Sequence, residues 1–509
     1  MLLRGGMVLF VGAITLTSIA LLVHLYISSG GPATRWASSR AWLPGSVLEK
    51  ITAPTCTTKL DWLDRIDRPS AFHYARREIV VKSNFNLNRS LLTKVKEPLF
   101  ANTQKIDLSE DSVAKWKYCQ DPMILDVPPI PAKPADASHL LFGISTTIKR
   151  LDQSIPALLR WLPRTRAKLV VIVIADDKTP AKEKEMNALQ AYMRDLGIDA
   201  TLIHPLREWH NFSMRYFSLI RAMYFYRTSQ TRWVSLIDDD TFFPSMPALL
   251  SMLEEHDHTK TIYLGALSED WWATVRYGLM AFGGAGIFLS LPMAQEMDRL
   301  HDKCIQSSHA PAGDIRVKEC IIRETDRKMR AVPELHQMDL HGDLSGFFES
   351  GRLPLSLHHW KEEGWGGMSL PLPNIHRIAD ICGECFMQRW QFGSDMILSN
   401  GISITIYPKQ GLKKGGIDGL PFDFGKLERT WDDALDVQGS INHGFDHSLP
   451  PTRRKLVAEE EKITFKLHET ETYSGGVVRQ SYFHKGVNGT LDGVFDLIWM
   501  REDNQEPVT

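Results

Sequence analysis

The sequence predicts an α/β protein with a mostly parallel sheet covered by helices. Two observations support this fold class. From residue 139 onward, short apolar runs alternate with amphipathic segments of helical period. The run AKLVVIVIAD at residues 167–176 is continuously apolar and rich in β-branched side chains, as in strands that are buried on both faces of a parallel sheet. Strands that alternate with helices form βαβ units, and their strands pair in parallel.

The expected elements follow one another closely. Strands are predicted at residues 139–146, 167–176, 199–205 and 232–238, and helices at 153–162, 181–197 and 213–226. The pattern of the second helix stops at Gly197, and glycine commonly ends helices.

The length of 509 residues exceeds what one hydrophobic core usually serves, so two folded parts with extensions are expected. With 43% hydrophobic and 24% charged residues, the composition is that of a globular protein, and a net charge of −2 gives no sign of a nucleic-acid partner. The proline-rich stretch 126–137 is taken as a boundary. The predicted parts are an irregular stem at 28–137, the α/β domain at 138–379 and a β-rich accessory region at 380–509.

The N-terminus predicts a membrane anchor. Residues 7–27 contain one histidine and no Asp, Glu, Lys or Arg, and a helix of that length spans about 30 Å, the hydrocarbon thickness of a bilayer. Cleaved signal peptides have a shorter apolar core and a small-residue cleavage site, and neither feature is present. Arg4 precedes the span while Arg35 and Arg40 follow it, so charge decides little about orientation. A cytoplasmic tail at 1–6, a signal anchor at 7–27 and a lumenal remainder are the simplest expectation.

Sequons and cysteines fit a secretory compartment. Asn-x-Ser/Thr triplets occur at Asn88, Asn211 and Asn488. The six cysteines are an even number, which favours disulfides in an oxidising compartment. Cys382 and Cys385 form a CxxC pair, with no second CxxC or histidine pair at zinc spacing. A disulfide or two unlinked half-cystines are therefore favoured over zinc.

Three consecutive acids, Asp238, Asp239 and Asp240, follow the predicted strand RWVSLI. In open α/β sheets, ligands bind at the carboxyl ends of strands. A divalent cation there removes the repulsion among carboxylates and favours their ionised form. Oxygen ligands suit Mg²⁺ or Mn²⁺, whose usual companions are phosphate oxygens. The alternative is an acidic turn that caps the following helix, SMPALLSMLEEH.

Two further segments support a ligand site. The segment MAFGGAGIFLS places Gly283, Gly284 and Gly286 between apolar stretches, where glycine allows close backbone approach or positive φ. The segment LPLSLHHW sets His358 and His359 at the end of an apolar run, and neutral imidazole is a good third ligand for Mn²⁺.

Taken in order, these segments resemble a known enzyme family. IDDDTFF, YGLMAFGGAGIFLS, AGDIRVKEC, ELHQMDLHGDLSGFF and LSLHHW are similar to motifs of the Fringe-like glycosyltransferases of family 31, which include the core 1 β-1,3-galactosyltransferases. The resemblance is closest to the plant and fungal branch that was long catalogued as a domain of unknown function. It covers about residues 138–365 and extends into CGECFMQRWQFGSDMILSNGISITIYP.

The resemblance implies a GT-A fold, a UDP-sugar donor, Mn²⁺ (or Mg²⁺), and inverting transfer to a glycan or glycoprotein acceptor in the Golgi membrane. By the same resemblance Asp240 would bind the metal, and Asp238 would contribute through water or the donor. His358, which follows Ser-Leu, matches the metal-binding histidine better than His359 does. The residues at 145–147 and 176 would meet uridine and ribose. The full donor and acceptor set comprises Ser145, Thr146, Thr147, Asp176, Asp239, Gly283, Gly284, Gly286, Glu269 and Trp271.

The reaction also requires a carboxylate on the acceptor side, because the acceptor hydroxyl loses its proton as it attacks the anomeric carbon. Asp314 stands where the resemblance places the catalytic base. Relatives often have two acids in a row, whereas Gly313 precedes Asp314 here, so a neighbouring site stays open, with Asp339 in reserve. The alternative role of Asp314 is to cap the helix that begins there.

Two flanking features complete the expected site. Cys304 and Cys320 flank the Asp314 loop and can form a disulfide that holds it. Glu269, Trp271 and Trp272 follow another expected strand, and they either form the floor of the acceptor site or pack against a loop.

Two other functions use similar chemistry. A metal-dependent hydrolase of nucleotide diphosphates would need the same acids with a positioned water and no acceptor cleft. A non-catalytic carbohydrate-binding or nucleotide-sugar-binding protein would keep the fold without turnover. The donor sugar, the acceptor, the linkage and the oligomeric state do not follow from the sequence.

Overall fold

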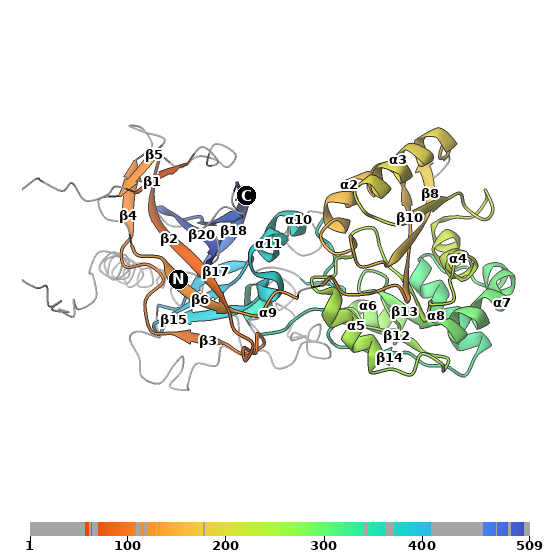
Figure 1. Cartoon of the computed structure of the whole chain (residues 1–509). Helices are drawn as coiled ribbons and strands as arrows, with labels where there is room; N and C mark the ends of the chain where they lie inside the picture. Colours follow the sequence, from red (N-terminus) through yellow and green to blue (C-terminus); the bar gives the residue numbers. More distant parts are fainter. Residues whose placement is uncertain are drawn as a thin grey trace, which may run out of the picture.

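The structure is a computed structural model. It describes residues 56–60, 63, 70–107, 113–116, 120–131, 133–176, 179–340, 345–349, 351–361, 371–408, 462–474, 476–486 and 490–502. Figure 1 shows an α/β lobe and a β-rich lobe with short helices between them.

The α/β lobe is built on one mixed sheet. Its strands are β7 Leu140–Thr147, β8 Lys168–Asp176, β9 Thr179–Pro180, β10 Ala200–Ile203, β11 Trp233–Leu236, β12 Tyr263–Gly265, β13 Ile287–Ser290 and β14 Arg330–Ala331. Within the described residues their order is β10-β8-β7-β11-β13-β12-β14, with β9 beside β8. The pairs β10–β8, β7–β8 and β11–β7 are parallel, whereas β13 runs antiparallel to both β11 and β12. The mixed α/β class and the four strands predicted before residue 239 are confirmed.

Helices cover the sheet. They are α2 Ile148–Leu158, α3 Glu183–Asp195, α4 Phe212–Phe225, α5 Met246–Glu254, α6 Trp271–Tyr277, α7 Leu291–Ser307 and α8 Gly313–Glu324. The helices α2, α3 and α4 match the three predicted ones, and Gly197 takes a φ of +84° just after α3, as expected for a glycine that ends a helix.

Burial on both faces explains the apolar run of β8. Val171 and Val173 belong to one hydrophobic cluster, and Val170 and Ile172 belong to another. Because successive side chains of a strand point to opposite faces, two separate cores require a strand without polar alternation.

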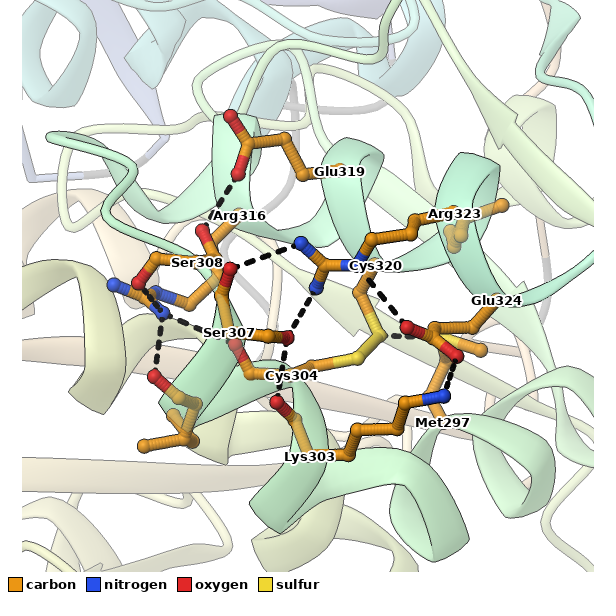
Figure 2. The surroundings of a disulfide bond; sticks show 12 residues. Met297, Lys303, Cys304, Ser307, Ser308, Arg316, Glu319, Cys320, Arg323 and Glu324 are labelled. Carbon is orange, nitrogen blue, oxygen red and sulfur yellow. Dashed lines mark hydrogen bonds and ion pairs between the residues drawn. A yellow bond between two sulfur atoms is a disulfide. The ribbon is translucent and has the colours of Figure 1, made fainter.

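A disulfide ties the end of α7 to α8 (Figure 2). Cys304 and Cys320 are joined across a sequence separation of 16. Beside them, the buried Arg316 donates to the carbonyls of Cys304, Ile305 and Ser308 at 3.2, 3.1 and 2.8 Å. The last carbonyls of a helix lack helical partners, so Arg316 supplies the missing donors. Together these contacts hold the loop that leads into α8.

The β-rich lobe combines two distant parts of the chain. From the N-terminal half come β1 Cys56–Lys59, β2 Ala71–Ser83, β3 Thr93–Val95, β4 Gln104–Asp107, β5 Val113–Trp116 and β6 Met123–Val127. From the C-terminal part come β15 Arg389–Phe392, β16 Met396–Ser399, β17 Ser403–Ile406, β18 Ile463–Tyr473, β19 Val477–His484 and β20 Asp492–Arg501. The order in the larger sheet is β3-β15-β16-β17-β18-β19-β20-β2-β4, with β6 beside β2, while β1 and β5 pair separately.

This sheet corrects the expectation of an irregular stem at residues 28–137. In its described part, β2 alternates buried and half-buried side chains and pairs in parallel with β20 from Phe72 to Val81. The partner strand lies some four hundred residues further along the chain, so pairing could not be anticipated from local pattern. The strands that the structure describes within 380–509, β15 to β20, are likewise one part of this shared sheet and not a separate accessory unit.

Short helices lie between the two lobes (Figure 1). They are α9 Ser345–Glu349, α10 Leu372–Ile375, η2 His376–Ile378, α11 Ala379–Cys382 and η3 Gly383–Cys385. The buried His376 donates from Nε2 to the Pro244 carbonyl at 3.1 Å, and its ring packs edge-on against Phe242 and Phe386. These contacts attach the short helices to the segment that follows the three acids. The β-rich lobe is attached through them, since Arg501 Nε of β20 donates to the Ile381 carbonyl of α11 at 2.9 Å.

Several predictions fall outside the described residues. The expected tail at 1–6, the anchor at 7–27 and the sequon at Asn488 lie there. Among the helices that the structure does describe, none is long and apolar enough to cross a bilayer. Asn88 and Asn211 are exposed, as a glycosylation acceptor must be, and Cys382 pairs with Cys385.

Replacing both Cys304 and Cys320 by serine is expected to lower the free energy of unfolding by about 3 kcal/mol, because the bond closes a loop of 16 residues. Urea unfolding of the wild type and the double variant measures the difference. The matched control replaces Cys382 and Cys385, which are only 3 residues apart, and should cost less. Equal stability of the wild type and the first variant would contradict a stabilising role for the bond.

Candidate active site

The three acids form a tight turn directly after β11. Asp238 N–H donates to Thr241 Oγ1 at 3.1 Å, and Thr241 N–H donates to the Asp238 carbonyl at 3.2 Å. Thr241 Oγ1 in turn donates to the Gly284 carbonyl at 3.0 Å, which joins this turn to the glycine segment. Consecutive side chains of a turn point in different directions, so the neighbouring carboxylates meet different partners.

Asp239 is neutralised by cationic side chains of the chain itself. It accepts hydrogen bonds from Thr146 Oγ1, from Arg150 Nε and Nη2 at 2.8 and 2.7 Å, and from Lys361 Nζ at 3.1 Å. Burial alone raises the pKa of Asp239, but the hydrogen bonds from Arg150 and the charge of Lys361 outweigh it, and the pKa lies below its usual value. Asp239 is therefore an ionised carboxylate that is fully engaged within the protein.

Asp238 and Asp240 share a histidine. His358 Nε2 lies 3.0 Å from Asp240 Oδ1 and 3.5 Å from Asp238 Oδ2. Burial raises the pKa of Asp240, but the charge of His358 outweighs this effect and lowers the pKa to about 2. Burial and the neighbouring acids raise the pKa of Asp238 to about 7. Burial lowers the pKa of His358, yet the two carboxylates raise it to about 9. In the metal-free protein, the protonated His358 ring thus supplies the positive charge at the place where a metal cation can bind.

Backbone pairing brings His358 to this place. Phe242 and the adjacent Leu357 exchange two backbone hydrogen bonds of 2.8 Å. His358 Nδ1–H donates to the Gln337 carbonyl at 3.1 Å. That bond keeps a proton on Nδ1 and turns Nε2 toward the acids, so Nε2 can offer its lone pair to a metal once its own proton is displaced, as in histidines that ligate metals.

The side chains fit a divalent cation. Asp240, His358 and His359 each offer one ligand atom, and these atoms lie within 4.8 Å of one another. The sequence favoured Asp238, Asp240 and His358, whereas this group contains His359 and leaves out Asp238. His359 Nε2 lies 2.9 Å from Asp339 Oδ1. Carboxylate oxygens combined with imidazole suit Mn²⁺ better than Mg²⁺, which prefers oxygen ligands alone.

The glycine segment clears space for side chains of the site. A Cβ on Gly284 would lie 2.2 Å from His358 Nδ1, and a Cβ on Gly283 would lie 2.6 Å from Tyr216 Oη. Gly286 has a φ of +96°, which side chains rarely adopt. The sequence predicted that these glycines line a ligand cleft. In the structure, Gly284 makes room for the His358 ring and Gly283 for the Tyr216 hydroxyl.

Asp314 lies in the first turn of α8 and is half-buried. It does not cap the helix, because the N-cap is Ala312; its Oδ1 accepts from Ile315 N–H at 2.7 Å and its Oδ2 from Gly283 N–H at 3.3 Å. Burial raises the pKa of Asp314, and the backbone hydrogen bonds offset only part of this effect. A raised carboxyl pKa suits a general base that works near neutral pH.

The reserve candidate Asp339 is more fully engaged. Its Oδ2 accepts from Ser268 Oγ at 2.5 Å, and its Oδ1 contacts His359. Glu269 is only 2% exposed, contacts His336 Nδ1 at 2.9 Å and accepts from Asp339 N–H at 3.2 Å. Glu269 therefore supports the segment that carries Asp339, and Asp314 is the better placed base.

The remaining predicted residues have different surroundings. Thr146 bonds Asp239, and Thr147 caps α2 by accepting from Arg150 N–H at 3.2 Å. The Ser145 hydroxyl is buried in β7 near the same edge of the sheet. Asp176 is exposed at the end of β8. Trp271 and Trp272 begin α6, and their side chains lie outside the described part.

Sequence reasoning missed three residues of this site: Arg150, Lys361 and Tyr216. Arg150 lies on the first turn of α2, and Lys361 follows the histidine pair. Both ion pairs with Asp239 join distant segments, so no local pattern indicated them. Tyr216 lies in α4, an amphipathic helix whose sequence pattern predicts only that this side chain belongs to the hydrophobic core.

A family model described as "Protein of unknown function, DUF604" matches residues 274–364. This segment includes the glycine loop, Asp314 and His358. The resemblance to a family of unknown function is confirmed to that extent, and the Fringe-like assignment stays a prediction. No curated protein sequence matches the chain.

Some solved structures overlap part of the chain. Glycosyltransferase GlyE from Streptococcus pneumoniae TIGR4 is 12% identical with a TM-score of 0.29, over 43% of this chain and 53% of its own. Mannosyltransferase PcManGT from Pyrobaculum calidifontis, solved with GDP-Man and Mn²⁺, is 12% identical with a TM-score of 0.27, over 44% of this chain and 63% of its own. Mouse xyloside xylosyltransferase 1 is 12% identical with a TM-score of 0.26, over 38% of this chain and 84% of its own. This chain spans about half the length of the first. TM-scores this low carry no conclusion about chemistry.

Replacing Gly284 by alanine is expected to weaken Mn²⁺ binding about tenfold or more, because the added Cβ would displace the His358 ring. Calorimetric titration with Mn²⁺ measures the affinity. The melting temperature of Gly284→Ala is the control, since it separates a loss of affinity from a loss of folding. Unchanged affinity in Gly284→Ala would show that the ring position does not control metal binding.

Mn²⁺ affinity is expected to rise about tenfold per pH unit between about pH 7 and 9. The metal must displace one proton from His358, whose pKa is about 9 in the metal-free protein. Below about pH 7 the dependence should steepen, because Asp238 then also binds a proton. Titrations across this range measure the slope, and His358→Gln should abolish its upper part. A flat profile in the wild type contradicts binding through His358.

Proposed function

We propose that this chain is an inverting glycosyltransferase with a GT-A-type domain of the Fringe-like class. It moves a sugar from a UDP-sugar to a hydroxyl of a glycan or glycoconjugate, in β-1,3 linkage, with bound Mn²⁺ (or Mg²⁺). One observation carries the proposal. The acidic turn and His358 lie on one side of the glycine loop, and Asp314 contacts the same loop through Gly283 N–H. A cation site and a carboxylate of raised pKa therefore adjoin at the carboxyl end of β11.

The transfer reaction requires both a cation site and a carboxylate base. The acceptor oxygen bonds to the anomeric carbon while the bond to the diphosphate breaks, and the electron pair leaves with the diphosphate. The proton of the acceptor hydroxyl passes to Asp314, and attack from the opposite face inverts the configuration. A divalent cation, when bound, stabilises the charge on the departing diphosphate. Arg150 and Lys361 engage Asp239, which leaves Asp238 and Asp240 available for the cation side.

The compartment is part of the proposal. The apolar stretch 7–27 anchors the chain as a single-pass type II protein, with the folded lobes in the Golgi lumen. The exposed Asn88 and Asn211 in sequons and the Cys304–Cys320 disulfide support an oxidising lumenal environment.

The test uses the full-length chain, purified in mild detergent and incubated with Mn²⁺ and a panel of UDP-sugars. UDP release is followed with and without mixed glycan acceptors. The wild type should release UDP from one donor, faster with acceptor. Asp240→Ala should abolish release, and Asp314→Asn should slow transfer at least about hundredfold because the base is lost. Asp195→Asn changes an exposed carboxylate at the end of α3 and should behave as the wild type.

Two outcomes would contradict the proposal. UDP release that yields free sugar and ignores acceptors would indicate a hydrolase of nucleotide diphosphates. Binding of Mn²⁺ and UDP without any release would indicate a non-catalytic protein that binds nucleotide sugars.

A further inference from the structure

Tyr216 is a buried residue with an unusual hydroxyl. It lies in the second turn of α4, and its side chain is 2% exposed. Within the described part of the chain its Oη has no hydrogen-bond partner. Buried hydroxyl groups are nearly always paired, because an unpaired one loses its bonds to water without replacement. Some other buried hydroxyls of the described residues are also unpaired, but that of Tyr216 lies beside the candidate active site, where a bound molecule can supply the partner.

Two glycines shape the space that Tyr216 occupies. A Cβ on Gly313, the first residue of α8, would lie 2.3 Å from Tyr216 Cβ and Cγ. A Cβ on Gly283 would lie 2.6 Å from Tyr216 Oη. The ring therefore passes over one glycine, and its hydroxyl ends at the other. Any side chain at either position would displace the tyrosine.

The Tyr216 hydroxyl lies near both the cation side of the site and the candidate base. The same Cβ position on Gly283 lies 3.0 Å from Asp238 Oδ1, and Gly283 N–H donates to Asp314 Oδ2. Gly283 thus lies beside Tyr216 Oη, Asp238 and Asp314 alike. The donor and the acceptor must meet beside these side chains if the proposed function is correct.

We propose that the Tyr216 hydroxyl donates a hydrogen bond to the attacking oxygen of the acceptor. This contact fits acceptors that react through a hydroxyl group. The inference rests on the proposed function. A hydroxyl oxygen has one proton and two lone pairs. The proton points to Asp314, one lone pair accepts from Tyr216, and the other faces the anomeric carbon. The two side chains together fix the direction of attack, which lowers the entropic cost of reaction. Tyr216 keeps its own proton throughout.

The experiment compares Tyr216→Phe with Tyr263→Phe in the full-length chain. Tyr263 is the matched control, because it is equally buried but its hydroxyl accepts from Ala281 N–H at 2.9 Å. Tyr216→Phe should raise the acceptor KM or lower kcat, about tenfold in kcat/KM, with donor KM and Mn²⁺ affinity unchanged. Its melting temperature should equal or exceed that of the wild type, since no internal bond is lost. Tyr263→Phe should melt lower and keep the acceptor KM.

The inference is overturned if Tyr216→Phe has the acceptor kinetics of the wild type, or if it melts as low as Tyr263→Phe. If the wild type transfers no sugar at all, the proposed function is wrong. The contact of Tyr216 with an acceptor is then tested by measuring acceptor binding. The probe is a set of methyl glycosides in the presence of Mg²⁺ and UDP, followed by saturation-transfer NMR, because Mg²⁺ is diamagnetic and does not broaden the ligand signals as Mn²⁺ does. Binding that is weakened in Tyr216→Phe alone supports the contact. Equal binding by all three proteins, or binding by none, overturns it.

Discussion

Repulsion among three consecutive carboxylates is the constraint on which this site depends. Two like charges about 4 Å apart interact by about 4 kcal/mol near a protein surface, so Asp238, Asp239 and Asp240 need separate compensation. The turn after β11 supplies it by sending Asp239 toward Arg150 and Lys361, and the other two toward His358. The compensating charges come from α2 and from the segment after Leu357, so the sheet, the first helix and a distant loop must all be in place.

The same constraint explains the surrounding architecture. The bridge between Phe242 and Leu357 holds the histidine beside the acids, and His376 bonds the Pro244 carbonyl just beyond the turn. The β-rich lobe is therefore attached, through the short helices, at the segment that carries the acids. Destabilising this joint would disturb the electrostatics of the turn, even though no residue of the large β-sheet reaches the acids in the described structure.

Glycine acts in this site mainly through the absence of a side chain. Gly284 admits the His358 ring, while Gly283 and Gly313 admit Tyr216. The backbone N–H of Gly283 also binds Asp314. One short segment thereby sets the separation between the cation side and the candidate base. The disulfide and Arg316 hold the loop that leads into α8, so the position of Asp314 is fixed from both directions.

The sequence by itself determined the α/β class, the strands through β11 and the acidic turn, because periodicity and strand-end chemistry are local properties. The family resemblance also predicted Asp240, His358 and Asp314 as members of one site, and in the structure His358 contacts Asp240 while Asp314 contacts the adjoining Gly283. Only the tertiary structure decided that β2 pairs with β20, that Asp239 is engaged by Arg150 and Lys361, and that Tyr216 reaches the site. Each of these contacts joins segments distant in the chain, and local pattern carries no information about which distant partner a side chain meets.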